Sequence, residues 1–342
     1  MVAFNIGLGI VCLVSGTSAG ALSAYNVDPN YVSVSGISSG GFMAAQLGIA
    51  HSSTFSSGFG VFAGGPFDCA RAQPVRCFPS VSTGTEDTKA PYLLQYITCM
   101  YNMKPSIVAP TANMKSWSGK QIDDVANLQS RKIYMQVGSI DTTVGPGVMQ
   151  QLRTQILAFA NQSETAYITT PGASHTFPTD FDQSGNNPCG MASSPYISNC
   201  GYDGAGAVLQ WIYGKLNARN SNKLDGQMIS FEQRGSYGAP GMDNTGYLYV
   251  PKRCVDGSTF IDNTGYDKWA DTNNMIIVFP QAVTDYALHP IWGGMMAPNP
   301  NACWDWIGWY GDDADQKGGR FTLMLTIPNK RSIYDIDKWP SY

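Results

Sequence analysis

The stretch Gly36-Ile37-Ser38-Ser39-Gly40 predicts a sharp turn that presents a serine. It follows a β-rich run, residues 31–35, and precedes residues 41–50, which are predicted to form a helix. A G-x-S-x-G turn between a strand and a helix is the signature of a nucleophile elbow, in which glycines relieve crowding around the serine. The sequence therefore predicts Ser38 as a nucleophile, with the N–H of Ser39 as an oxyanion donor near the helix N-terminus.

A serine nucleophile needs a base to take its proton, and the sequence contains three histidines. His51 ends the predicted first helix, and His289 precedes a proline in what is predicted to be an irregular aromatic loop. His175 closes the loop Pro171-Gly172-Ala173-Ser174-His175 after a predicted strand. Loops at the carboxyl ends of parallel strands form the site in such folds, so we predict His175 as the base.

The third member of the predicted triad is a carboxylate. Asp141 follows the predicted strand 132–137 after three further residues, whereas Asp123 and Asp124 lie in a helical or turn stretch. The alternative role for Asp141 is that of a turn residue capping the following loop. The order Ser38, Asp141, His175 is that of an α/β-hydrolase triad, in which serine attacks an acyl carbon, histidine moves the proton and aspartate orients histidine.

Predicted strands and helices alternate along the chain. The predicted strands are residues 31–35, 58–63, 132–137, 166–170, 246–251 and 275–280. Two further helices are predicted, one with Val148, Leu152, Ile156 and Phe159 on one face and one over residues 202–216. This alternation predicts an α/β fold with a largely parallel sheet flanked by helices, and the chain length suits one large or two modest domains.

The composition favours a secreted enzyme. The 342 residues are 43% hydrophobic and 13% charged, and the net charge of −4 gives no basic surface for nucleic acid. Residues 1–21 are predicted to be a signal peptide, with a buried helix as the alternative, because a short apolar run precedes Ala19-Gly20-Ala21. Residues 22–319 then form the predicted catalytic domain and residues 320–342 a poorly ordered tail. We expect a monomer that binds no membrane.

The cysteines indicate disulfides rather than a metal site. Seven remain after the predicted signal peptide: Cys69, Cys77, Cys99, Cys189, Cys200, Cys254 and Cys303. Cys189 and Cys200 close a short loop and are predicted to pair, whereas Cys69 is predicted to pair with Cys99 or Cys77. The odd total leaves one thiol over. No C-x-x-C pair or histidine-rich cluster suggests a metal, and nothing suggests an organic cofactor.

The order of the segments is unusual for an α/β hydrolase. Several strands ordinarily precede the elbow in that fold, and the loop after one of them supplies the second oxyanion donor. Here the candidates for those strands, residues 246–251 and 275–280, come after the predicted triad. This order suggests a circular permutation, with the usual front of the domain moved to the back.

Five segments resemble the fungal extracellular poly(3-hydroxybutyrate) depolymerases. They are Val32-Ser33-Val34-Ser35-Gly36-Ile37-Ser38-Ser39-Gly40-Gly41, Gly138-Ser139-Ile140-Asp141-Thr142-Thr143-Val144, Gly172-Ala173-Ser174-His175-Thr176-Phe177-Pro178, Tyr247-Leu248-Tyr249-Val250-Pro251 and Asn301-Ala302-Cys303-Trp304-Asp305-Trp306. The resemblance covers most of residues 25–319. It implies a secreted, single-domain, circularly permuted α/β hydrolase with Ser38, Asp141 and His175 as its triad. It also suggests that Trp306, with Trp304, lines the groove for the polymer chain; the alternative is a buried core tryptophan.

Three stretches depart from that family pattern. The insert at about 78–98 is longer than expected, and the tail after Gly319 lacks the closing helix. The family also has a strand ending in a His-Gly-Cys turn, which supplies the second oxyanion N–H, between the segments that match Val250 and Phe260. Its absence here leaves Cys254 and Cys303 without their expected partners, and a bond between those two is one alternative. We interpret the departures together as the mark of a mis-spliced gene model, which a sequenced transcript would test.

The sequence as a whole predicts a secreted serine esterase of poly(3-hydroxybutyrate) or its oligomers. One alternative is a secreted polymer-binding protein that lacks a working oxyanion hole. Another is an esterase of a different substrate class, such as feruloyl esters or lipids. A purely structural, cysteine-stabilised protein is disfavoured because the predicted triad is complete.

Overall fold

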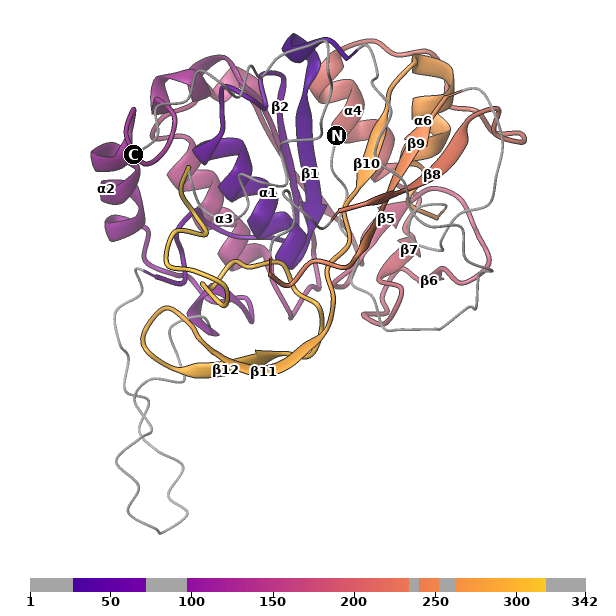
Figure 1. The fold of residues 1–342 in the computed structure, drawn as a ribbon. Helices are drawn as coiled ribbons and strands as arrows, with labels where there is room; N and C mark the ends of the chain where they lie inside the picture. The colour runs from indigo at the N-terminus through magenta and orange to yellow at the C-terminus, as the bar shows by residue number, and fades with distance from the viewer. Residues whose placement is uncertain (1–26, 72–96, 234–239, 252–262, 318–342) are drawn as a thin grey trace.

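A parallel four-stranded sheet forms the centre of the molecule (Figure 1). The computed structural model describes residues 27–71, 97–233, 240–251 and 263–317, so the predicted signal peptide, most of the insert and the tail lie outside the described residues. The sheet has the order β1-β2-β3-β4. Its strands are β1 (Ser33–Ile37), β2 (Gly58–Phe62), β3 (Lys132–Gly138) and β4 (Thr165–Thr170). The predicted α/β fold with a mostly parallel central sheet is confirmed.

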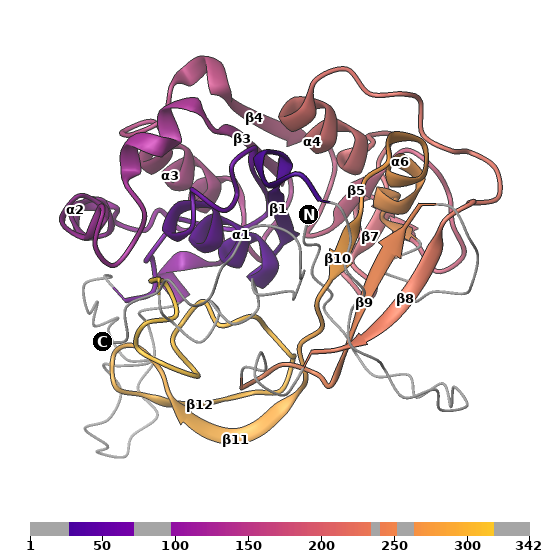
Figure 2. The same ribbon diagram turned by 45° about the horizontal axis from the view of Figure 1, so that its top comes forward.

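Helices cover both faces of this sheet. Gly48 of α1 (Ser39–Ala50) lies against Phe59 of β2, whereas the next strand residue, Gly60, faces Val208 of α4 (Gly204–Tyr213). Because successive residues of a strand point to opposite faces, α1 and α4 pack on opposite sides. The remaining helices are α2 (Val108–Trp117), α3 (Pro146–Ile156), which lies beside α1, and α6 (Tyr266–Asn273) (Figure 2). Among the described helices, none is long and apolar enough to cross a membrane.

Three smaller sheets surround the central one. An antiparallel sheet has the order β10-β9-β8, and a parallel sheet of short strands has the order β5-β7-β6. The last two strands, β11 and β12, form an antiparallel hairpin. Their bounds are β5 (Phe177–Thr179), β6 (Asn187–Pro188), β7 (Ile197–Asn199), β8 (Gln227–Glu232), β9 (Thr245–Val250), β10 (Ile277–Phe279), β11 (Asp285–Pro290) and β12 (Met296–Asn299).

Strand β1 is the outer strand of the central sheet, yet every one of its residues is buried. Sheet β8–β10 lies on this side of β1 in both views, although no ladder between β1 and β10 is found among the described strands (Figures 1 and 2). A buried strand edge must satisfy its backbone N–H and C=O groups. This arrangement suits a permuted order in which strands late in the sequence lie on the β1 side of the central sheet.

Local sequence patterns predicted the central elements to within a few residues, but three predictions were wrong in detail. The helix expected over residues 202–216 ends at Tyr213, because Gly214 adopts a left-handed φ of 79°. Phe159 lies beyond the end of α3, although Val148, Leu152 and Ile156 are buried as predicted. His289 does not lie in an irregular loop: it belongs to strand β11, where it pairs with Ala297 of β12. Local composition does not reveal this pairing, because it depends on the neighbouring strand β12.

Contacts between partly exposed cations and buried carboxyl groups attach the segment before residue 318 to the rest of the domain. Arg71 pairs with Asp315 at 2.9 Å and with Asp68 at 3.2 Å, and its guanidinium lies 4.2 Å from the ring centroid of Trp292. Lys317 pairs with Asp123 at 2.7 Å. Burial, together with a hydrogen bond to Asp315, raises the pKa of Asp68 to about 8. The attachment therefore contains a carboxyl group that remains protonated near neutral pH.

Asp68 should make the stability of the protein depend on pH. Its pKa is higher in the folded state than the value of about 4 expected in the unfolded chain, so the folded state retains a proton that the unfolded state loses. The stabilising contribution is thus complete below pH 4 and decreases as pH rises through 8. Substitution Asp68→Asn, which is neutral at every pH, should flatten the pH dependence of the free energy of unfolding, measured with urea between pH 4 and 8.

The matched control is Asp312→Asn, because the Asp312 side chain is exposed in the same segment. It should keep the wild-type pH dependence. Equal slopes for the wild type and Asp68→Asn would show that Asp68 does not hold its proton in the folded state.

Candidate active site

The three residues of the predicted triad all follow parallel strands, so they lie at the carboxyl ends of the strands of the central sheet. Ser38 comes directly after β1, Asp141 follows the end of β3, and His175 follows the end of β4. Neighbouring strands end opposite one another: Ile37 at the end of β1 pairs with Phe62 at the end of β2, and Gly138 at the end of β3 pairs with Thr170 at the end of β4. Parallel strands that end in register deliver their following loops to one place. In Figure 1 this edge faces the hairpin β11–β12.

Ser38 adopts a backbone conformation that is rare for a residue with a side chain. Its φ of 58° and ψ of −124° lie outside the regions of regular structure, and its N–H donates to the carbonyl of Phe62 at 3.0 Å. Such strain persists only where surrounding contacts enforce it, and it is typical of functional turns. The strained turn places Ser38 directly before helix α1, as the G-x-S-x-G pattern predicts.

Crowding behind the turn explains two glycines, Gly41 and Gly64. A Cβ atom on Gly41 would lie 2.7 Å from the carbonyl oxygen of Phe62, and one on Gly64 would lie 2.6 Å from the carbonyl carbon of Gly41. The backbone of the first turn of α1 therefore lies directly against the backbone at the end of β2. Both close contacts involve Gly41, which lies one residue beyond the five-residue motif. The motif therefore did not predict the need for glycine at this position.

The side chains of Asp141 and His175 form a buried pair. Asp141 Oδ2 lies 2.8 Å from His175 Nδ1, and each residue is 2% exposed. The second carboxylate oxygen, Oδ1, accepts the N–H groups of Thr143 and Val144 at 2.8 and 2.9 Å. Both oxygens are therefore satisfied, as a buried carboxylate requires. Asp141 thus makes the turn hydrogen bonds of the capping alternative and contacts His175 as well.

Backbone contacts between two loops bring this pair together. The N–H of Ser139 donates to the carbonyl of Thr170 at 3.0 Å, and that of Ile140 donates to the carbonyl of Ala173 at 3.1 Å. Only a glycine fits at position 138, because its Cβ would lie 2.2 Å from the oxygen of Ala173. Sequence reasoning missed the role of Gly138, and its position at the end of the predicted strand, three residues before the predicted acid, was the available signal.

A disulfide supports the loop that carries His175. Cys189 bonds Cys200, as predicted, and the carbonyl of Cys189 accepts the N–H of Ser174, the neighbour of His175, at 3.0 Å. The second disulfide joins Cys69 to Cys99, one of the two predicted alternatives. Its other predicted partner, Cys77, lies outside the described residues, as does Cys254.

Cys303 is the free cysteine among the described residues, and it lies against the elbow. Its thiol forms a hydrogen bond with the side chain of Ser39, and burial raises the pKa of the thiol. Asn299 holds the backbone of Cys303 from both sides, with two hydrogen bonds of 2.8 Å. Cys303 therefore contacts the residue whose N–H is the predicted oxyanion donor.

The two predicted substrate-binding tryptophans are buried. Trp304 is 2% exposed and Trp306 is 7% exposed. Trp306 stacks on Phe42, in the first turn of α1, with ring centroids 4.3 Å apart. Asp305 organises their loop: its carboxylate accepts the N–H groups of Gly308, Trp309 and Tyr310 at 2.7–2.8 Å. Their role in substrate binding stays a prediction, since in this conformation each presents little surface to a ligand.

The other two histidines have different surroundings. His51 lies at the opposite end of α1 from Ser38, and burial lowers its pKa to about 4. His289 pairs with Asp285 at 2.7 Å on the hairpin. The molecule thus contains a second His–Asp pair, which is partly exposed and lies outside the predicted triad. Within the described ranges, no group of three His, Cys, Asp or Glu side chains is suited to hold a metal ion.

Substitution Gly41→Ala should destabilise the protein, because the new methyl group would overlap the carbonyl oxygen of Phe62. We expect the free energy of unfolding to fall by about 1–3 kcal/mol, the usual cost of overpacking. Chemical denaturation of the purified protein measures it. Gly190→Ala is the control, since its nearest neighbouring atom would be 3.8 Å away. Equal losses for the two variants would contradict the crowding at the elbow.

Comparison with known proteins identifies relatives over most of the chain. A curated polyhydroxybutyrate depolymerase of Talaromyces funiculosus is 58% identical over 323 residues, covering 88% of this chain and 89% of the relative. A poly(3-hydroxybutyrate) depolymerase of Delftia acidovorans is 36% identical over 326 residues, and the match spans 58% of its length. No family model matches the chain.

Solved structures agree with the sequence relatives. The crystal structure of a PHB depolymerase from Penicillium funiculosum has a TM-score of 0.81 and 56% identity, and the match covers 90% of this chain and 97% of that one. A serine-to-alanine variant of a PHB depolymerase, complexed with an R3HB trimer, matches with the same values. The fold, the arrangement of the candidate site and these identities lead to one conclusion: the chain belongs to the polyhydroxybutyrate depolymerase family.

Proposed function

We propose that the chain is a secreted, monomeric serine esterase that hydrolyses the ester bonds of poly(3-hydroxybutyrate) or its oligomers. The buried Asp141–His175 pair, at the same sheet edge as the strained Ser38, is the observation that carries the proposal. Family membership supports the choice of substrate, because the relatives are named for this polymer and one related structure is complexed with an R3HB trimer.

The protonation of His175 follows from its partner. Asp141 accepts a hydrogen bond from Nδ1–H, so the lone pair of a neutral imidazole lies on Nε2. His175 Nε2 is buried and has no hydrogen-bond partner among the described residues. A group in this state is ready to accept a proton from a serine hydroxyl. We assign that proton to Ser38.

The proposed reaction proceeds through an acyl-enzyme. Ser38 Oγ bonds to the ester carbonyl carbon while its proton moves to His175 Nε2. The bond from that carbon to the alcohol oxygen then breaks, and the leaving alcohol takes the proton from the imidazolium. A water molecule, deprotonated in turn by His175, releases the hydroxy acid and restores Ser38. Asp141 orients the ring throughout and stabilises its charged form.

The N–H of Ser39, in the first turn of α1, is the proposed oxyanion donor. N–H groups of a first helical turn have no partner within the helix, and the helix dipole favours a negative charge there. The sequence between Val250 and Phe260 lacks the His-Gly-Cys turn that would supply a second donor, and residues 252–262 lie outside the described residues. Loss of one donor lowers kcat by about 10²- to 10³-fold.

The unpaired outer side of β1 is compatible with one alternative function, that of a polymer-binding protein without esterase activity. Without a strand beside β1, the chain would retain the loop around Trp304 and Trp306 and bind the polymer without hydrolysing it. A phosphonate ester that reacts with the activated serine separates the two functions. Rapid labelling favours the esterase, and polymer binding without labelling favours the binding protein.

Substitutions in the Asp141–His175 pair should remove hydrolysis of a 3-hydroxybutyrate trimer without unfolding the protein. Asp141→Asn disturbs the orientation of the imidazole and should lower kcat by about 10⁴-fold, as in other serine hydrolases. Ser38→Ala and His175→Ala should lose the acyl-enzyme pathway altogether. The release of 3-hydroxybutyrate units measures kcat, and circular dichroism confirms that each variant is folded.

The second His–Asp pair provides the matched control. His289→Ala and Asp285→Asn remove the same chemical groups from the hairpin and should keep the wild-type kcat. Equal losses in both pairs would mean that the substitutions act through the fold. Full activity in His175→Ala would contradict the proposed base.

A further inference from the structure

One tripeptide in the sequence has no role in the proposed reaction. Asn161-Gln162-Ser163 is the single Asn-x-Ser/Thr sequence without proline at x in the 342 residues. This sequence is the acceptor for N-linked oligosaccharides in the secretory pathway, but only an accessible site retains a bulky sugar. Whether the tripeptide can accept a sugar therefore depends on where it lies in the fold.

The tripeptide lies on the surface in a short turn. Residues 161–163 are all exposed, and Asn161 caps the 3₁₀ turn Gln162–Glu164, which leads into β4. The Asn161 amide nitrogen, Nδ2, donates to the carbonyl of Gln129 at 2.8 Å. A side-chain amide nitrogen has two hydrogens, and this bond uses one of them. The hydrogen bond can therefore persist when a sugar replaces the other hydrogen.

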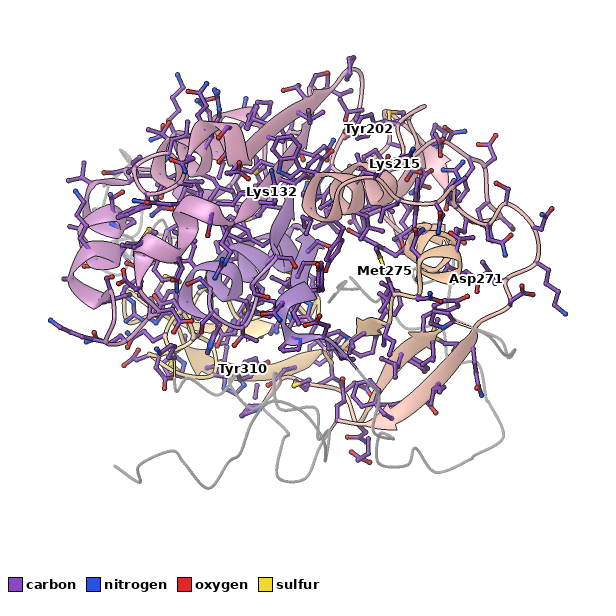
Figure 3. All side chains as sticks on the ribbon, turned by 90° about the horizontal axis from the view of Figure 1, so that it is seen from above. Lys132, Tyr202, Lys215, Asp271, Met275 and Tyr310 are labelled. Carbon is purple, nitrogen blue, oxygen red and sulfur yellow. A yellow bond between two sulfur atoms is a disulfide. The ribbon has the colours of Figure 1, made fainter. Side chains whose placement is uncertain are left out.

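The turn and the candidate active site lie at opposite ends of β4. Asn161 precedes the strand, whereas His175 follows it, and a six-residue strand is about 20 Å long. Lys132, at the start of β3, pairs with Glu164 of the turn at 2.6 Å. Figure 3 looks onto this end of the molecule and labels Lys132. A sugar on Asn161 would leave the edge of Ser38 and the hairpin uncovered.

We propose that Asn161 carries an N-linked oligosaccharide. The inference rests on the proposed secretion and is independent of the esterase mechanism. The donor class is an oligosaccharide joined through a diphosphate to a lipid. A bond forms between Asn161 Nδ2 and the anomeric carbon, the bond from that carbon to the diphosphate oxygen breaks, and the amide releases one proton as the lipid diphosphate leaves.

The disulfides support the compartment that this transfer needs. Cys69–Cys99 and Cys189–Cys200 are bonds that form and persist in an oxidising environment such as the lumen of the secretory pathway. A chain that acquires them there passes the enzymes that attach oligosaccharides. The solitary, exposed tripeptide is then the Asn-x-Ser/Thr acceptor that the folded chain presents.

The test is expression of the full chain in a yeast secretory host, followed by peptide-N-glycosidase treatment and mass spectrometry of the peptide that contains residue 161. Wild-type protein should lose mass on treatment, and Asn161 should become aspartate. Ser163→Ala removes the acceptor hydroxyl while keeping Asn161 and its bond to Gln129, so this variant should carry no sugar. Ser163→Thr keeps a hydroxyl and should remain modified.

Secreted wild-type protein with unmodified Asn161, or a chain that stays inside the cell unmodified, would overturn the inference. Sugar on Asn161 in Ser163→Ala would do the same. Trimer hydrolysis by each form is measured separately, and Ser163→Ala should keep the wild-type kcat and KM. Glycosylated protein without hydrolysis would count against the proposed esterase alone, so the two failures are distinguishable.

Discussion

The contact between the loops after β3 and β4 is the constraint on which the candidate site depends. Gly138 approaches the oxygen of Ala173 so closely that no side chain fits between the loops. That approach sets Asp141 Oδ2 within 2.8 Å of His175 Nδ1. A buried carboxylate is costly without hydrogen bonds, and here two backbone N–H groups and the imidazole satisfy it. The orientation of the imidazole is therefore built into the fold before any substrate arrives.

The turn at Ser38 and the tryptophan-containing loop around Trp304 and Trp306 support the same site from another side. Phe42 stacks on Trp306, and Cys303 contacts Ser39, so a segment near the end of the described chain supports the first turn of α1. Strand β1 is fully buried although it pairs with β2 alone among the described strands.

Sequence reasoning succeeded where the signal is local. The G-x-S-x-G turn, the period of α3 and the loops after β3 and β4 are each encoded within a few neighbouring residues, and they predicted the elements that position Ser38, Asp141 and His175. It failed where pairing is distant. The hairpin containing His289 depends on a bulged register with β12, and the Asp305 turn depends on N–H groups that local composition does not reveal. Burial of Trp306 against α1 is likewise a tertiary property.

The central claim is that Ser38 is the residue activated by the Asp141–His175 pair. The most direct test is titration of the folded, full-length protein with a phosphonate ester, followed by tandem mass spectrometry of the modified peptide. The account predicts one phosphonyl group per chain, located on Ser38, and much slower labelling when Asp141 is replaced by Asn. Stable, folded protein that gains no label, or gains it on another residue, would contradict the account.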